Sequence, residues 1–184
     1  MTAVGVERDL LTRARDGDQR AFAELVGNHR NHIWAVCLGI TGDHQDAEDA
    51  LQNTLVAAWQ NLEKFRGDSR FATWMHRIAS NNALMIVRKR KPARSLSEPS
   101  AEQEYAITLT DETPSVEERV ADSDLLRDAL SALPEDFRVA LVLREFGDMT
   151  YADIAEHQGD GIQTIKSRIS RARSQLMQEL STSR

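Results

Sequence analysis

The sequence predicts an all-α protein with two small helical domains joined by a flexible acidic linker, the C-terminal domain being a helix-turn-helix. Apolar residues recur at helical spacing along most of the chain, and no strand-like alternation of any length occurs. Hydrophobic residues make up 41% of the chain and aromatic residues only 5%, which suits helical units better than a thick β core. The stretch from Pro92 to Pro114, rich in Pro, Ser, Thr and Glu, has no helical period and separates the two periodic regions.

Length and composition exclude several classes of protein. The longest apolar run, Ile33 to Ile40, is far shorter than the roughly 20 residues that cross a bilayer, and the N-terminus lacks the pattern of a signal peptide. We therefore expect a cytoplasmic protein without membrane insertion of its own. The single cysteine, Cys37, lies in this apolar stretch and is expected to be a buried, unreactive thiol.

The net charge of −6 is unevenly distributed along the chain. Residues 1–91 carry 13 Lys and Arg against 11 Asp and Glu, whereas residues 92–133 carry 3 against 10 and residues 134–184 carry 7 against 8. The excess of negative charge lies in residues 92–133, so it does not argue against binding of nucleic acid by either end of the chain.

The first domain begins with a predicted helix from Glu7 to Arg15, which Gly17 ends. Asp18 is expected to cap one longer helix from Gln19 to about Leu38. His29 and His32 share a face of this helix, but no carboxylate stands at a known metal-ligand spacing. A solvated or core-edge pair of histidines is therefore favoured over a metal site.

Asp43 is expected to cap the next helix, which runs to about Leu62. One face of this helix is apolar. The reverse face is polar with one aliphatic residue, and it is either solvated surface or a protein-docking face; it carries Asp46, Asp49, Asn53, Val56 and Gln60.

The segment KFRGDS, Lys64 to Ser69, is predicted to be a turn, and Asp68 or Ser69 to cap a helix that continues to Lys91 before Pro92 stops it. Asn81 and Asn82 lower the helix propensity in its middle, which indicates a hydrogen-bonding requirement. Its basic end from Arg88 to Lys91 either complements the helix dipole or binds phosphates.

The second domain begins with a predicted helix from about Ser115, and Pro134 starts the next one, which Gly147 ends. Thr150 and Asp153 form a predicted capping box for a short helix from Tyr151 to about His157. Two glycines then supply a turn. The last helix places its apolar residues on one face, at Ile165, Ile169, Ala172 and Leu176.

The opposite face of this last helix has the composition of a DNA-reading surface. In a helix-turn-helix the N-terminal part of the second helix meets base edges. The candidate base readers are Gln163, Lys166, Ser167, Ser170 and Arg171, and Arg168 and Arg173 are expected to hold phosphates. The alternative is a helical hairpin with a solvated basic face.

Longer motifs carry a resemblance to a known family. DAEDALQNTLVAAWQNLEKFRGDSRFATWMHRIASNNA is followed by an acidic tether, by LPEDFRVALVLREFGDMTYADIA and by TIKSRISRAR. In this order the motifs resemble bacterial RNA polymerase sigma factors of the extracytoplasmic-function (ECF) group of the sigma-70 family, over nearly the whole chain. The resemblance implies core RNA polymerase and promoter DNA as partners, an anti-sigma factor as regulator, and no enzymatic activity, cofactor or metal.

The resemblance also implies a division of labour. Residues 7–92 would dock on the polymerase clamp and open the minus-10 element, 93–114 would be the acidic linker, and 115–180 would recognise the minus-35 element. Polymerase binding would fall to Asp46, Asp49, Gln52 and Asn53. Minus-10 DNA would be held by Lys64, Phe65, Arg66, Gly67, Asp68, Ser69, Trp74, Arg77, Asn81, Arg88, Lys89, Arg90 and Lys91.

Three positions depart from the family's pattern. Asn53 stands where an acid is usual, Met85 where Asp is common, and QGDG replaces the usual apolar residue and proline in the turn of the helix-turn-helix. Asp160 in this turn is expected to face water.

Two rival functions account for less of the sequence. A stand-alone helix-turn-helix regulator would leave the whole first domain unexplained and would predict a dimer on a palindromic site. A small enzyme would need a P-loop, an HExxH motif, a nucleophile elbow or a convergent set of His and carboxylates, and the sequence has none of these.

Overall fold

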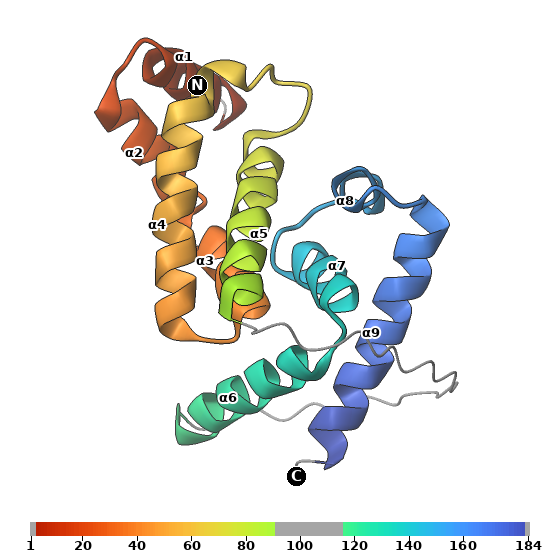
Figure 1. The fold of residues 1–184 in the computed structure, drawn as a ribbon. Coiled ribbons are helices and arrows are strands. Elements are labelled where there is room, and N and C mark those ends of the chain that lie inside the picture. Colours follow the sequence, from red (N-terminus) through yellow and green to blue (C-terminus); the bar gives the residue numbers. More distant parts are fainter. Residues whose placement is uncertain (1–2, 91–115, 183–184) are drawn as a thin grey trace.

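The computed structural model of the chain describes residues 3–90 and 116–182 (Figure 1). In these two ranges every regular element is a helix, so the all-α prediction is confirmed. The first domain contains α1 (Ala3–Arg15), α2 (Gln19–Gly27), α3 (Arg30–Thr41), α4 (His44–Asn61), the 3-10 helix η1 (Leu62–Lys64) and α5 (Phe71–Arg90). The second contains α6 (Val116–Ala132), α7 (Glu135–Glu145), α8 (Tyr151–Gln158) and α9 (Ile162–Thr182). The predicted linker, residues 93–114, lies outside the described residues, as does Lys91.

The N-caps predicted at Asp18, Asp43 and Thr150 form as expected, whereas α5 begins only at Phe71, so the cap predicted at Asp68 or Ser69 is wrong. The Asp18 side chain accepts hydrogen bonds from the backbone of Arg20 and Ala21, and Asp43 accepts one from the Asp46 backbone at 2.9 Å. Thr150 and Asp153 form the reciprocal capping box at the start of α8. These side chains satisfy backbone donors that have no partner within the helix, so each fixes where its helix begins.

The prediction of one continuous helix from Gln19 to Leu38 is wrong. The chain forms α2 and α3 instead, because α2 ends at Gly27 and α3 begins only at Arg30. Asn28 is the C-cap of α2, and His29 is the N-cap of α3, with a φ of −117°. Gly and Asn both have low helix propensity, which makes this point the least costly place for the chain to bend.

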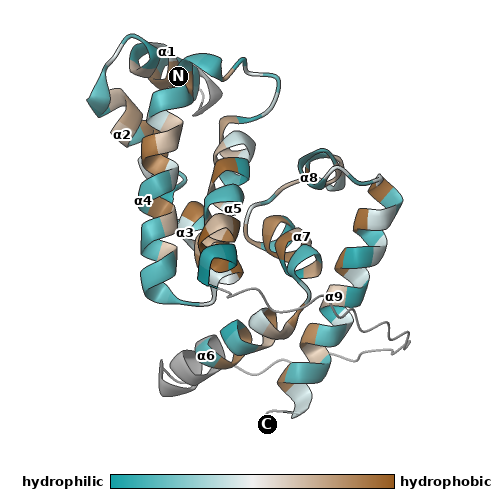
Figure 2. Ribbon diagram, viewed as in Figure 1, coloured by the Kyte–Doolittle hydropathy of each residue, from teal (hydrophilic) through white to brown (hydrophobic). Residues whose placement is uncertain are grey.

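The buried apolar residues of the two domains form one continuous cluster. In the first, α3, α4 and α5 pack against one another around Ile33, Ile40 and Met75. In the second, α7, α8 and α9 enclose Met149 and Ile154 together with the apolar face of α9. Hydrophilic and hydrophobic residues alternate along α4 and α9, as expected for helices with one buried side (Figure 2). None of the described helices is long and apolar enough to cross a membrane.

The two domains also pack on each other. Helix α3 contacts both α6 and α7, and α5 contacts α7. At Gly39 a Cβ atom would lie 2.9 Å from Cγ2 of Val142, so only glycine allows α3 and α7 to approach this closely. The two domains are therefore in direct contact, and α5 faces the second domain (Figure 1).

Candidate nucleic-acid and polymerase interface

The buried and exposed faces of α9 divide as the sequence predicts. Ile165, Ile169 and Ala172 are buried against the rest of the second domain. The five candidate base readers are all exposed: Gln163, Lys166, Ser167, Ser170 and Arg171. Exposed donors on a helix that follows a tight turn have the arrangement needed to enter a major groove. Their contact with bases stays a prediction.

Ile162 is a further candidate for DNA contact that the structure adds. It is the first residue of α9, beside Gln163, and its side chain is 46% exposed. An apolar side chain at this end of a recognition helix can contact the methyl group of thymine. Only its exposure in the structure identifies Ile162 as a candidate, because an apolar residue at helical spacing in the sequence is expected to be buried in the core.

Arg171→Ala should weaken binding to the cognate minus-35 duplex by about 1–3 kcal/mol and relax the preference at one base pair. Arg173 makes a hydrogen-bonded ion pair with Glu145. Arg173→Ala should therefore weaken binding modestly and equally for all sequences. Binding to a library of duplexes measures both effects. An unchanged preference profile for Arg171→Ala would show that this residue does not face the bases.

Arg168 lies in a different environment from the other basic residues of α9. Its side chain is only 13% exposed, and its Nη1 donates to Gln158 Oε1 at 2.6 Å and to Asp160 Oδ2 at 2.9 Å. Gln158 in turn donates to the Asp136 carbonyl at 3.1 Å. Asp160 is exposed, as expected, and it also accepts a hydrogen bond from Arg168. The network links α7, α8 and α9 across the QGDG turn.

Arg168→Ala should therefore act mainly through the angle between α8 and α9. A lost phosphate contact lowers the slope of log affinity against log salt by about 1, whereas a lost turn contact weakens binding at every salt concentration with little change in slope. We expect the second behaviour, together with a lower thermal unfolding midpoint. A salt titration of duplex binding distinguishes the two, and Asp160→Asn is the matched control for the turn contact.

The predicted base-capturing loop has one inward and several outward residues. Phe65 is buried, with its ring centroid 5.8 Å from that of Phe71 and 5.2 Å from that of Trp74. Lys64, Arg66, Gly67 and Asp68 are exposed, whereas Ser69 is half-buried. Packing of Phe65 and Trp74 anchors the loop, which leaves its polar residues available to a ligand.

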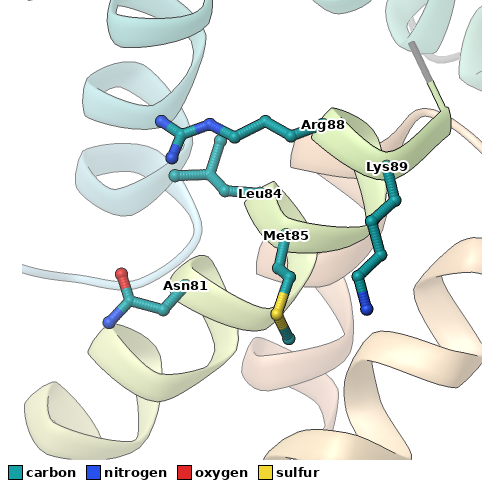
Figure 3. A pocket seen from close by; sticks show the side chains of 5 residues that line it. All are labelled: Asn81, Leu84, Met85, Arg88 and Lys89. Atoms are coloured by element: carbon teal, nitrogen blue, oxygen red, sulfur yellow. The ribbon is translucent and has the colours of Figure 1, made fainter. Parts of the chain in front are cut away.

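The two central asparagines of α5 have different surroundings. Asn82 points inward and donates to the Thr54 hydroxyl and to the Ile78 carbonyl, at 3.3 Å and 3.1 Å. Asn81 is exposed and lines an open hollow with the side chains of Leu84, Met85, Arg88 and Lys89 (Figure 3). These two hydrogen bonds give Asn82 a structural role, which explains an asparagine in the middle of the helix. Asn81 lies beside an apolar floor and two cations, a combination that suits an unstacked base.

Arg77 and Arg88, both predicted to hold DNA, contact acids of the second domain. Arg77 Nη2 donates to Glu156 Oε2 at 2.6 Å and lies 3.9 Å from Asp153 Oδ1. Arg88 Nη2 donates to Glu135 Oε1, also at 2.6 Å. The cations could be identified from the sequence, but their partners could not, because the pairs join residues that are far apart in the chain.

The candidate polymerase-binding residues share the outer face of α4. Asp49, Gln52 and Asn53 are exposed, and Val56 beside them is 55% exposed. Asp46 differs, because its Oδ2 accepts a hydrogen bond from Arg90 at 2.7 Å. An exposed aliphatic residue among polar ones is typical of a protein-docking surface.

His76 and His157 lie near the boundary between the domains. His76 is 2% exposed, neither of its ring nitrogens has a hydrogen-bond partner, and burial, with smaller contributions from nearby His29 and His32, lowers its pKa to about 4. Burial lowers the pKa of His157 as well, and Arg77 acts in the same direction. Among residues 3–90 and 116–182, no three His, Cys, Asp or Glu side chains gather as metal ligands would.

Comparison with known proteins shows the family. Residues 25–93 match the family model described as sigma-70 region 2, and residues 123–176 match the model of sigma-70 region 4. The RNA polymerase sigma-H factor of Pseudomonas aeruginosa is 38% identical over 180 residues, which cover 91% of this chain and 90% of that protein. The ECF RNA polymerase sigma-E factor of Haemophilus influenzae is 34% identical over 173 residues, covering 91% of each.

Two solved structures are similar along most of the chain. One is CnrH in complex with the cytosolic domain of CnrY, with a TM-score of 0.70 and 25% identity over 96% of this chain and 98% of that one. The other is the sigma factor RpoE in complex with the anti-sigma factor NepR from Bartonella quintana, with a TM-score of 0.61 and 28% identity over 83% of this chain and 91% of that one. The chain belongs to the ECF group of sigma-70 family RNA polymerase sigma factors.

Proposed function

We propose that this sigma factor acts in the cytoplasm, where it binds core RNA polymerase through α4 and recognises promoters with two separate surfaces. The observation that carries the proposal is the presence of one candidate DNA surface in each domain, on α9 and on α5. A stand-alone regulator would use α9 alone. The proposed domains are 7–92, 93–114 and 115–180, with the acidic linker between the two reading units.

The two surfaces suit different forms of DNA. The exposed donors of α9 suit base edges in the major groove of the minus-35 duplex. Asn81, the hollow of α5 and the Lys64–Ser69 loop suit bases of the opened minus-10 strand, since an amide, an apolar floor and cations can hold unstacked bases and their phosphates. The first surface would therefore act before opening and the second during it.

Asn81→Ala should reduce promoter opening more than it reduces binding of closed promoter DNA. The reason is that Asn81 is exposed in the hollow and supports no described contact of the core, so its loss removes a contact made only to the opened strand. Permanganate footprinting measures opening, and gel-shift binding of closed complexes serves as the reference. Asn82→Ala is the matched comparison, and because it loses bonds to Thr54 and Ile78 it should lower stability instead. An equal loss at both steps for Asn81→Ala would contradict the role.

An anti-sigma factor is the proposed regulator. The support is that the structurally similar RpoE is solved in complex with an anti-sigma factor. Such a protein would need to cover the α4 face or the DNA surfaces.

Run-off transcription on a genomic DNA pool tests the proposed function directly. Core RNA polymerase is assayed with and without this protein, and transcripts are mapped. Start sites that require the protein, with a shared motif upstream, are the expected result. A set of start sites identical in both reactions would reject the function.

A further inference from the structure

Helix α1 ends beside the start of the predicted base-capturing loop, Lys64–Ser69. Its last residue, Arg15, donates a hydrogen bond from Nη2 to the carbonyl oxygen of Phe65. The guanidinium also lies over the Phe65 ring, with Cζ 5.8 Å from the ring centroid, which is close enough for a cation–π contact. Helix α1 thus holds Phe65 by its backbone and by its ring, although Arg15 and Phe65 are 50 positions apart in the chain.

The Phe65 carbonyl determines the direction in which the loop leaves η1. Phe65 is the C-cap of η1, with a ψ of 107°, and its N–H donates to the Leu62 carbonyl at 3.2 Å. Because the peptide bond is planar, the Phe65 carbonyl and the Arg66 N–H turn together. A donor that fixes this oxygen therefore fixes the plane from which Arg66 starts. A guanidinium is a charged donor, so its hydrogen bond is stronger than one between neutral groups.

The rest of the loop has few contacts of its own. Gly67 has a φ of +81°, and no atom lies within 4 Å of the position that a Cβ would take there. Arg66 Nε lies 3.2 Å from Asp68 Oδ2, but these side chains are 83% and 77% exposed, so the ion pair contributes little. Arg70, just after the loop, donates from Nη2 to the Asp148 carbonyl at 3.0 Å. The shape of the loop therefore depends on how its two ends are held.

Arg15 is itself fixed in place by the end of α1. Leu10 anchors this helix on the core and is only 2% exposed. Gly17 follows the helix with a φ of +91°, and the Asp18 N–H donates to the Arg13 carbonyl at 3.0 Å. Backbone hydrogen bonds of this kind close a helix end. The last turn of α1 is thus a rigid support from which the Arg15 side chain reaches the loop.

We propose that Arg15 is a positioning residue, which shapes the Lys64–Ser69 loop for an unstacked base before the promoter strand arrives. Arg15 acts on the loop backbone and does not touch the DNA. A loop that is ordered beforehand loses less conformational freedom on binding, which strengthens binding without a new contact. The inference rests on the proposed function in one respect, namely that this loop receives a base of the opened minus-10 strand.

Three variants separate the contact with Phe65 from the positive charge of α1. Arg15→Ala removes both the hydrogen bond and the ring contact. Arg15→Lys keeps the charge and a donor but loses the planar guanidinium, so it should restore the effect only in part. Arg8→Ala is the matched control, because it removes the charge of an exposed arginine of the same helix.

The order of the loop is measured in the free protein, by NMR relaxation of the backbone amides. In Arg15→Ala the order parameters of residues 66–69 should fall below about 0.6, the range of flexible backbone, while those of α9 stay near 0.85. Arg15→Lys should be intermediate, and Arg8→Ala should match the wild type. Unchanged order parameters in Arg15→Ala would overturn the proposal, whatever the function of the protein.

Capture of the base is measured with the protein bound to core RNA polymerase. The DNA is a single strand with the minus-10 element of a promoter mapped by run-off transcription, and an abasic site is moved along it one position at a time. Wild-type binding should fall about tenfold at the captured position, where one base loses its contacts. If about a tenth of the loops in Arg15→Ala keep the receiving shape, this variant should bind the intact strand about tenfold more weakly. The abasic site at the captured position should then cost it little more.

Two results of this second measurement would also overturn the proposal. Equal weakening of the intact and the abasic strand by Arg15→Ala is what a purely structural role predicts. A slope of log affinity against log salt that is smaller by about 0.7 would place Arg15 itself on a phosphate of the single strand. Start sites that do not depend on the protein would reject the proposed function alone, and the order parameters would still decide whether Arg15 shapes the loop.

Discussion

Asp49→Arg should abolish association with core RNA polymerase and with it all promoter-specific transcription. Asp49 is exposed on the outer face of α4, beside Gln52, Asn53 and Val56. Asp46 on the same helix is engaged by Arg90, and Asn53 carries no charge, so Asp49 is the acid of the predicted set that is most available to a basic partner. Reversal of its charge replaces an attraction with a repulsion across the interface, which costs several kcal/mol.

The measurement is a pull-down of core enzyme by the tagged sigma factor, followed by run-off transcription. A surface substitution of this kind changes the free energy of unfolding by no more than about 0.5 kcal/mol, so thermal unfolding should be unaltered. Glu24→Arg is the matched control, because it makes the same change of charge at an exposed residue of α2. If Asp49→Arg retains core enzyme as well as the wild type does, the outer face of α4 is not the docking surface.

Acidification below pH 6.5 should destabilise the chain through His76. The ordinary pKa of histidine is 6.5, and in the folded chain burial lowers the pKa of His76 to about 4; His29, His32 and Arg70 act in the same direction. Between these two values the folded state binds fewer protons at this site than the unfolded state. Stability is therefore complete above pH 6.5 and falls as the pH falls towards 4.

The loss is roughly 1.4 kcal/mol per pH unit inside this window, or about 3 kcal/mol when it is complete. The pKa of His157 is lowered by burial and, to a smaller extent, by Arg77, so its protonation in acid also lowers the stability of the folded chain. His157 faces Ser80 and Arg77 of α5, with Asp153 and Glu156 on its own helix.

Urea unfolding at a series of pH values between 7 and 4 measures this effect. His76→Leu removes the titrating group and fills its buried position with an apolar side chain, so its stability should fall less steeply over this range. His44→Gln is the matched control, since it removes an exposed histidine of α4 and should keep the wild-type slope. A slope in His76→Leu equal to that of the wild type would contradict the role of His76.

The local features of the fold could be predicted because their causes lie within a few residues. Thr150 and Asp153 meet across one helical turn, and the apolar stripe of α9 repeats every three or four residues. The division between α2 and α3 was missed because its cause is weak propensity at Gly27 and Asn28, which a strong apolar period on both sides conceals. Propensity differences of this size are smaller than the packing energies that decide the outcome.

The candidate site was predictable in its composition but not in its connections. The exposed face of α9 and the basic end of α5 follow from periodicity. Periodicity could not show that Arg168 is bonded to Gln158 and Asp160, or that Phe65 is buried against Phe71. A basic residue near the edge of a helix face has the same spacing in the sequence whether its side chain points to solvent or to a neighbouring loop.

The sequence by itself therefore determined the class of fold, the helix caps at Asp18, Asp43 and Thr150, the helix-turn-helix and the family. Only the tertiary structure decided that α5 faces α7 and α8, with Arg77 on Glu156 and Ser80 beside His157, although each pair is separated by more than 75 residues in the chain. Helix caps and apolar stripes are set by neighbours along the chain, which a sequence displays directly. Ion pairs between domains depend on the relative placement of whole helices, and that placement is fixed by the packing of surfaces such as Gly39 on Val142.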